Sequence, residues 1–397
     1  MTILEGKKVK EMKVVIIRGP SLSTVELGWL EGLDEKYEVF AIGSRDPIYN
    51  LDHFPVSVKK LFCSGQVFGK LPFAIRLLYA LDGDPQRLWG LERAIKGADV
   101  VDSAEIGNLY TYQAALARKK GFVKKLVVRI YENLAPVMEI SENRRRREKI
   151  KFVLRNADTF VAVSPLSFEY LELMGVSGNK IIKVPMGVDT DRFVPAGSAK
   201  KQALRKSLGY NKNDKIILSI GRMVWEKGWL DLLRSARKLY LEGRNYKWLW
   251  VGDGPLVSFL KNEVGRWNLG KNVKLVSGLQ MPYPKMHEFY QLADLFVMPS
   301  IPISNWQEQF GLVLAEAMSS GLPCVVTKTG TLPFVLGDGG GLEVSPQDWM
   351  GLGKAVNYVL SHPKKAQEWS ERNRNEAQKR FGFGVIKDKM INIWETV

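Results

Sequence analysis

Two glutamates stand in an otherwise apolar segment, NWQEQFGLVLAEAMSSGLPCVV, at residues 305–326. Glu308 and Glu316 are eight positions apart, and Glu316 falls inside a stretch that predicts a core helix. Burying an unpaired carboxylate costs several kcal/mol, so we expect a partner for its oxygens. Gly311 is predicted to begin the helix, where the amides of Gly311 and Leu312 can face an anion. A phosphorylated sugar offers phosphate to those amides and hydroxyls to both carboxylates.

Two basic residues occupy a second junction between a predicted strand and a predicted helix, SIGRMVWEKGWLDLLRSARKLY. Arg222 follows the strand, and Lys227 precedes a helix with an apolar stripe. Positive charge at the amino terminus of a helix is unfavourable unless an anion is shared there. The pair therefore indicates a phosphate site, with ordinary surface basicity as the alternative.

A third junction, VGDGPL, contains two glycines that allow close approach of the backbone. Gly252 and Gly254 could admit a ligand, although the geometry of a tight turn explains them equally well. The full GxGxxG fingerprint of a dinucleotide site is absent here and also after the first predicted strand.

Five segments together resemble a known family. EQFGLVLAEAMSSGLPCVV, GRMVWEKG, VGDGP, ADLFVMPS and VPMGVDTDRF are similar, in content and order, to motifs of the retaining family-4 glycosyltransferases of the GT-B fold (glycosyl transferases group 1). The likeness extends over nearly the whole chain, and its specific part lies between Val184 and Val326. A glutamate pair alone is weak support, whereas five motifs in order are strong support.

The resemblance implies a role for each motif residue. Arg222 and Lys227 hold the diphosphate of a nucleotide-sugar donor, Glu316 the ribose hydroxyls and Glu308 the hydroxyls of the transferred sugar. The amides after Phe310 help to hold the diphosphate and sugar. Cations and amides of this kind stabilise the negative charge that develops on the leaving nucleoside diphosphate. We therefore expect no metal and no cofactor besides the donor substrate, a UDP- or GDP-sugar.

Two Asp-x-Asp spacings, Asp82/Asp84 and Asp189/Asp191, are similar to the metal site of the other major transferase fold. The first pair lies in the turn-like DGDP and the second in the predicted joint between domains. We interpret both pairs as structural.

The amino-terminal half departs from the family pattern. Gly19 stands alone where relatives have a glycine-rich loop, and none of the three histidines occupies the place of the family's histidine near the sugar. The matching run, VVRIYENLAP, supplies Glu132, which we assign to the catalytic set because some branches have a similar Glu-Asn. Glu105, at another predicted strand end, is interpreted as either an acceptor contact or a helix-capping carboxylate. Trp306 is interpreted as either a ligand contact or a packed aromatic residue.

Strands alternate with helices from end to end, in two series joined around VPMGVDTDRFVPAGSAKK. This alternation predicts α/β domains with parallel sheets covered on both faces. We expect a GT-B fold of two Rossmann-like, doubly wound domains facing each other across a cleft. Residues 1–190 form the acceptor-side domain and residues 191–377 the donor-binding domain, with a helix over 378–397 packing back on the first.

The net charge of +16 favours polyanionic partners. The run Arg144–Arg147 is interpreted first as a solvated helix face, then as a patch for anionic lipid or an acidic acceptor, and nucleic acid is not expected. LPFAIRLLYALDG is too short to span a membrane, and core helix is favoured over an amphipathic helix on a membrane. Two cysteines and no evident signal peptide indicate a cytoplasmic protein or one peripheral at the cytoplasmic membrane face.

The sequence therefore predicts a retaining, metal-independent transferase. It would move a hexose-type sugar from a nucleoside diphosphate sugar to an unidentified glycan, lipid or small molecule. Two alternatives stay open: a nucleotide-sugar epimerase of the same fold, and a catalytically degenerate partner subunit that binds nucleotide sugar.

Overall fold

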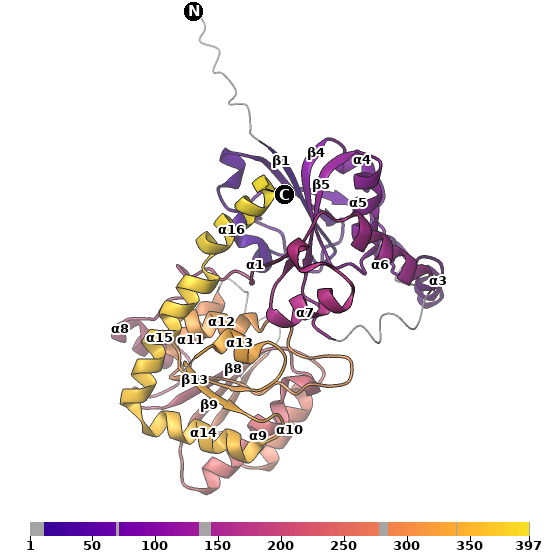
Figure 1. Cartoon of the computed structure of the whole chain (residues 1–397). Helices are drawn as coiled ribbons and strands as arrows, with labels where there is room; N and C mark the ends of the chain where they lie inside the picture. The colour runs from indigo at the N-terminus through magenta and orange to yellow at the C-terminus, as the bar shows by residue number, and fades with distance from the viewer. Residues whose placement is uncertain (1–11, 69–70, 135–143, 278–284, 339, 397) are drawn as a thin grey trace, which may run out of the picture. The chain divides into compact units, whose positions relative to one another are not determined.

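The computed structural model describes residues 12–68, 71–134, 144–277, 285–338 and 340–396 (Figure 1). Residues 1–11, on which the expectation about a signal peptide partly rests, lie outside these ranges. The chain divides into two compact units. Unit 1 comprises Met1–Gly187 and Ile386–Val397, and unit 2 comprises Val188–Val385. The sequence prediction placed the two divisions at residues 190 and 377.

Among the described residues of unit 1, seven strands form one parallel sheet in the order β3-β2-β1-β4-β5-β6-β7. The order reverses between β1 and β4, which makes the carboxyl ends of these strands the expected ligand edge. Near-continuous apolar runs account for the burial of the central strands, as is typical of a parallel sheet covered on both faces. The strands are β1 (Lys13–Gly19), β2 (Glu38–Ser44), β3 (Ser57–Leu61), β4 (Ala98–Ala104), β5 (Val123–Ile130), β6 (Thr159–Ala162) and β7 (Ile181–Lys183).

Local signals in the sequence begin several helices of unit 1. Ser164 caps α7 by accepting a hydrogen bond from the amide of Ser167, and a proline follows it at the first helical position. Ser23 caps α1 in a similar way through the amide of Val25. The helices are α1 (Thr24–Leu27), α2 (Ser64–Phe68), α3 (Pro72–Asp82), α4 (Leu91–Ile95), α5 (Leu109–Lys119), α6 (Arg144–Asn156), α7 (Pro165–Leu173) and α16 (Phe383–Thr396), with 3-10 turns at Gly28–Leu30, Leu33–Glu35 and Gly178–Lys180.

Helix α16 completes the core of unit 1 from the far end of the chain. The Trp394 ring lies 5.7 Å from the ring of Trp29, centroid to centroid, and both side chains are buried. Arg129 Nη2 lies 2.9 Å from the sulfur of Met390. Residues Ile386–Val397, which belong to unit 1 although they follow unit 2 in the sequence, therefore supply part of its core.

The boundaries differ from the prediction because α15 (Pro363–Phe381) stays with unit 2 to its last residue. The Phe381 ring packs edge-on against Phe310 at 5.5 Å. The amide of Val188 donates to the carbonyl of Phe381 at 2.7 Å, and Phe383 donates to the carbonyl of Val188 at 3.1 Å. These contacts assign Val188 and the end of α15 to unit 2, and the return to unit 1 begins at Ile386.

The described part of unit 2 holds six parallel strands in the order β10-β9-β8-β11-β12-β13, so the order reverses between β8 and β11. The strands are β8 (Ile216–Ile220), β9 (Lys247–Val251), β10 (Val273–Val276), β11 (Leu295–Met298), β12 (Cys324–Thr327) and β13 (Gly341–Val344). The remaining helices are α8 (Ser198–Ser207), α9 (Trp229–Leu241), α10 (Val257–Arg266), α11 (Met286–Leu292), α12 (Leu312–Ser319), α13 (Leu332–Leu336) and α14 (Trp349–Ser361), with a 3-10 turn at Trp225–Lys227.

Helix α3 is not the core helix that the sequence favoured. None of its residues whose burial is described is buried. Its apolar composition indicates an interior helix, but periodicity alone does not say which elements surround it. Among the described residues, no helix is both long enough and apolar enough to cross a membrane.

Candidate active site

The carboxyl edge of the sheet in unit 2 gathers the loops after β8, β9, β11 and β12, and two glycines bring the first two together. A Cβ on Gly252, after β9, would lie 1.8 Å from the carbonyl oxygen of Gly221, after β8. A Cβ on Gly254 would lie 2.6 Å from the carbonyl oxygen of Met223. The two glycines therefore admit a neighbouring loop, the one that carries Arg222, rather than serving a tight turn alone.

Lys227 and Glu308, both predicted as site residues, form an ion pair. Lys227 Nζ lies 2.5 Å from Glu308 Oε1, and the Ser300 hydroxyl donates to the same oxygen at 2.6 Å. The Lys227 ammonium lies 4.6 Å from the centroid of the Trp306 ring. Glu308 is only 4% exposed, which makes the pair a largely desolvated one. The sequence identified both charges but predicted neither their pairing nor Ser300.

The backbone of Glu308 is held by the loop after β12. A Cβ on Gly330 would lie 2.1 Å from the Glu308 carbonyl oxygen, so only glycine permits this approach. The amide of Thr331 donates to the same carbonyl at 3.1 Å. The loop sequence Thr329-Gly330-Thr331 thus fixes where Glu308 stands.

Helix α12 positions the second carboxylate. Gly311 precedes it with φ at 81°, a left-handed conformation that suits glycine, and has no side chain to cap the helix amides. Glu316 is 2% exposed, and the Tyr290 hydroxyl on α11 donates to its Oε2 at 2.7 Å. The buried carboxylate thus has a partner within the protein, which the sequence reasoning missed. Tyr290 stands in an ordinary apolar helix segment, and no signal in the sequence marks it.

Arg222 occupies the same edge with its guanidinium in solvent. Its side chain is 66% exposed and lies 3.7 Å from the carboxylate of Glu226. The Trp229 indole donates to the Arg222 carbonyl at 2.8 Å and fixes the backbone beneath the exposed side chain. An exposed pair of this kind contributes little energy, so the guanidinium can turn toward an anion.

The predicted residues of unit 1 contact other residues of the same unit. Gly19 ends β1 with φ at 53°, and a Cβ there would lie 3.1 Å from the Tyr110 ring. The carboxylate of Glu132 accepts from the amides of the next two residues at 2.9 and 3.0 Å. Glu105 accepts from the amides of Tyr131 and Glu132 at 2.7 and 3.1 Å, so it orders the loop after β5 rather than capping a helix.

A buried ion cluster at the end of β1 was not predicted. Arg18 is 1% exposed and donates to Glu26 at 2.7 Å and to Asp102 at 3.0 Å. Burial acts to lower the pKa of Arg18, but the two carboxylates raise it well above its ordinary value. Burial and the nearby Glu26 carboxylate, which accepts from the Tyr131 hydroxyl, raise the pKa of Tyr131. The sequence did contain one signal for this cluster: Arg18 is a charged residue within the apolar run KVVIIRG, where a buried charge needs a partner.

The Asp-x-Asp carboxylates make structural contacts. Asp82 binds Lys149 at 3.0 Å, Asp84 accepts from the amide of Leu109 at 2.6 Å, and Asp189 accepts from the amide of Asp191 at 3.2 Å. Within the described ranges, no group of three or more His, Cys, Asp or Glu residues is arranged to hold a metal ion.

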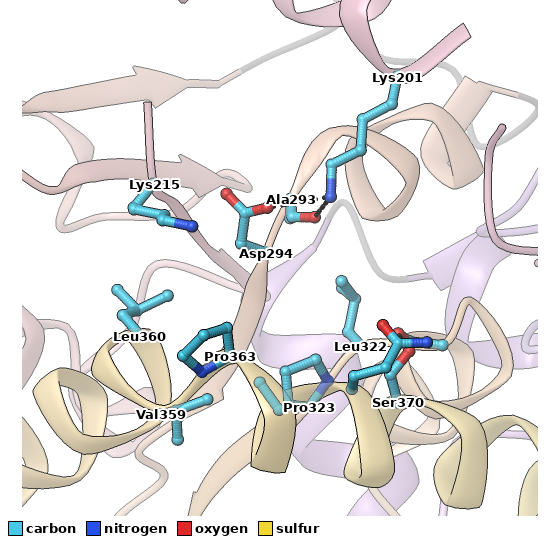
Figure 2. Close-up of a pocket in the computed structure, with 13 residues that line it drawn as sticks. Lys201, Lys215, Ala293, Asp294, Leu322, Pro323, Val359, Leu360, Pro363 and Ser370 are labelled. Atoms are coloured by element: carbon cyan, nitrogen blue, oxygen red, sulfur yellow. Dashed lines mark hydrogen bonds and ion pairs between the residues drawn. The ribbon is translucent and has the colours of Figure 1, made fainter. Parts of the chain in front are cut away.

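A pocket of about 180 Å³ lies at the opposite, amino-terminal edge of the sheet in unit 2 (Figure 2). Lys215, Asp294 and Pro323 directly precede β8, β11 and β12 and line the pocket. Lys201 reaches from α8 to Asp294, with Nζ 3.0 Å from its carboxylate (Figure 2). The pair fastens α8 to the sheet on the edge away from Glu308.

Residues 200–376 match the family model described as glycosyl transferases group 1. Over these residues the match confirms the resemblance to glycosyl transferases group 1 that was drawn from the motifs. Mannosylfructose-phosphate synthase of Agrobacterium fabrum is 27% identical over 277 residues, which are 67% of this chain and 59% of that protein. D-inositol 3-phosphate glycosyltransferase 2 of Catenulispora acidiphila is 30% identical over 57% of this chain and 53% of its own length. The matched part of the chain thus spans less than two thirds of either relative.

Solved structures resemble the chain over nearly its full length. HepE of Anabaena, in complex with UDP, has a TM-score of 0.78 at 17% identity and covers 97% of this chain and 100% of its own. A sucrose-phosphate synthase from Thermosynechococcus elongatus has a TM-score of 0.71 at 21% identity and covers 97% and 98%. The predicted fold class, α/β with the Rossmann-like domains of the GT-B fold, is confirmed.

Proposed function

Starting from the match of residues 200–376 to glycosyl transferases group 1, we propose that the chain is a retaining glycosyltransferase. It moves a hexose-type sugar from a UDP- or GDP-sugar to an acceptor hydroxyl on a glycan, lipid or small molecule. The observation that carries the proposal is the cluster in unit 2, where buried Glu308 pairs with Lys227 next to the uncapped start of α12.

The donor diphosphate is assigned to positive groups at the carboxyl edge of this sheet. Lys227 is already neutralised by Glu308. Arg222 makes only a weak, exposed pair with Glu226, so its guanidinium can turn toward the diphosphate. The amides at the start of α12 add partial positive charge and hydrogen-bond donors. Together these groups stabilise charge that grows on the leaving diphosphate as the sugar departs.

The two glutamates are assigned to hydroxyl groups of the donor. Glu316 takes the ribose, and the Tyr290 hydroxyl holds its carboxylate in one orientation before the donor arrives. Glu308 takes the transferred sugar, with Ser300 and Lys227 fixing its position. Preoriented acceptors of this kind reduce the entropy lost on binding.

In the proposed reaction the bond between the anomeric carbon and the phosphate oxygen breaks, and its electron pair stays on that oxygen. The acceptor hydroxyl attacks the same face of the sugar, and its proton passes to the leaving phosphate. Retention and this front-face course rest on the family resemblance. Because protein cations and amides stabilise the leaving group, we expect turnover to persist in EDTA, and loss of turnover in EDTA would contradict this part.

Thermal unfolding with UDP, GDP, ADP and CMP, for the wild type and Glu316→Ala, tests the donor site first. A ligand at about 100 times its dissociation constant adds roughly 2.7 kcal/mol to the free energy of unfolding. We expect one nucleotide to shift the wild type and not the variant, and no shift from any nucleotide would contradict the proposal. Incubation with donor alone then tests the first alternative, because formation of an isomeric nucleotide sugar indicates an epimerase. Assays with donor and a range of acceptors test the second, because binding without turnover for any acceptor indicates a partner subunit.

A further inference from the structure

Helix α3 of unit 1 presents apolar side chains to solvent. Its sequence, PFAIRLLYALD, has one cation and one carboxylate in eleven residues. Phe73 is 80% exposed, Leu77 48% and Leu81 49%. A helix that is apolar all round is normally covered, and eleven residues are too few for the roughly 20 that cross a bilayer. Something outside unit 1 is therefore expected to cover α3.

The exposed side chains of α3 share one broad face. At 100° per residue, they fall within an arc of about 200°, and the partly covered Ala74, Ile75, Leu78 and Asp82 fall in the remaining arc. Arg76 lies within the outward arc. This is the pattern of a helix that lies on a surface along its length.

Helix α2, which contacts α3, and the neighbouring Trp89 add further exposed apolar side chains. Trp89 is 60% exposed, and its amide and indole donate to the Phe62 carbonyl at 2.9 Å and to Ser64 Oγ at 3.0 Å, which hold it beside β3 and α2. Exposed apolar area on this scale marks an interaction site on a protein surface. We define the apolar surface of unit 1 as Phe62, Val67, Phe68, Leu71, Phe73, Leu77, Tyr79, Leu81 and Trp89.

Basic residues border this surface through α6, which packs on the end of α3 (Figure 1). Lys149 donates to the Asp82 carbonyl at 2.6 Å, and Arg145 donates to the Leu81 carbonyl at 3.2 Å. A groove of about 710 Å³ between the two helices contains more cations than carboxylates. Its lining is Leu81, Asp82, Tyr112, Arg144, Arg145, Glu148, Lys149, Phe152 and Arg155.

We propose that the apolar surface of unit 1 docks on a bilayer that contains anionic phospholipid. The aromatic and aliphatic side chains enter the boundary between head groups and acyl chains, while the exposed Arg144 and Arg145 at the start of α6 meet the lipid phosphates. Arg76 extends its charge to the head groups while its stem stays apolar. Charge complementarity favours a lipid surface over a neutral protein partner. The inference is independent of the proposed transfer reaction, since it uses neither the donor site nor turnover.

Co-sedimentation with vesicles tests the proposal. One set is phosphatidylcholine alone, and the other contains roughly one third phosphatidylglycerol. Two double variants probe the two components: Phe73→Ser with Leu77→Ser, and Arg144→Gln with Arg145→Gln. The matched control is Leu173→Ser with Leu241→Ser, which removes two exposed leucines, 67% and 68%, that are not part of this surface.

We expect the wild type and the control to bind the anionic vesicles, and the serine pair to bind about tenfold or more weakly. The glutamine pair should lose about tenfold on anionic vesicles and much less on neutral ones. The circular dichroism spectrum and the melting temperature of each variant without ligand serve as the folding check, so failure here stays separate from failure of the donor site. A wild type that ignores anionic vesicles, or a folded serine pair that binds them as the wild type does, overturns the proposal. Dimerisation that depends on Phe73 and Leu77, without vesicle binding, overturns it in favour of a second copy.

Discussion

Glu308 and Glu316 are both buried, but their partners differ in kind. Glu308 is held by an ammonium and a hydroxyl, whereas Glu316 accepts from a neutral tyrosine. Removing one member of a buried ion pair leaves an uncompensated charge, while removing the tyrosine hydroxyl takes a single hydrogen bond from a carboxylate and costs less. The two sites should therefore respond differently to substitution.

Glu308→Gln should abolish most turnover while keeping donor binding. The neutral amide no longer balances Lys227, which then turns to the donor phosphate and leaves the sugar hydroxyls without their carboxylate. We expect kcat to fall about a hundredfold or more, with KM for the donor unchanged or lower. Steady-state kinetics measure both, with Ser300→Ala as a control that removes a single hydrogen bond. A Glu308→Gln enzyme with full kcat would refute the assigned role.

Glu316→Gln and Tyr290→Phe separate binding from folding. The glutamine amide oxygen still accepts from Tyr290, so the fold survives, and donor affinity should drop by about tenfold or more through loss of a charged acceptor. Tyr290→Phe instead deprives a buried carboxylate of a donor and should lower the free energy of unfolding by about 1–3 kcal/mol. Nucleotide titration and denaturant unfolding read the two effects. Equal losses of affinity and stability in both variants would count against this division.

For single residues, the motifs identified those whose charge is visible in the sequence, namely Arg222, Lys227, Glu308 and Glu316. They could not identify Tyr290, because its contact crosses 26 positions between two helices and its own segment is ordinary. The sequence marked Gly252 and Gly254 as sites of close approach, but it did not show that the loop after β8 is what approaches them. That depends on which loops the strand order brings together.

At the scale of elements, the alternation of apolar strands and helices was sufficient to predict both parallel sheets. Period and length mark a buried strand well, because its apolar run is short and bounded by turns. They failed for α3, whose burial is decided by its neighbours. Nor do they show to which unit the end of α15 belongs, since that depends on the packing of Phe381 on Phe310 just before the chain turns at Gly382.

Asp294→Asn should weaken the attachment of α8 in a pH-dependent way. Burial acts to raise the pKa of Asp294, but Lys201, the Ile216 amide and Arg205 lower it further, so the net shift is downward. A carboxyl whose pKa is lowered by folding stabilises the protein above its ordinary pKa and loses that contribution as pH falls. We expect Asn to cost about 2 kcal/mol or more near neutrality, with the cost shrinking below about pH 4. Denaturant unfolding across that range measures it, and a cost independent of pH would contradict the role of the charge.

At the scale of the molecule, unit 1 is built from two distant stretches of chain. Trp394→Ala should leave a cavity against Trp29 and lower the stability of unit 1 by about 3–5 kcal/mol. Unit 2 should keep its own stability, so calorimetry is expected to show two transitions, of which only the upper responds to nucleotide. A single transition, lowered as a whole, would mean that the two units unfold together.

The distant origin of α16 also has a consequence in time. Unit 2 is continuous, Val188–Val385, and is made entirely after the first stretch of unit 1 and before the second. At about 5–20 residues per second, synthesis of this insert takes on the order of 10–40 s. During that interval the nascent first sheet lacks Met390 and Trp394, and the buried face around Trp29 stays open to water or to a chaperone. Synthesis of unit 2 is thus complete before unit 1 has all the residues of its core.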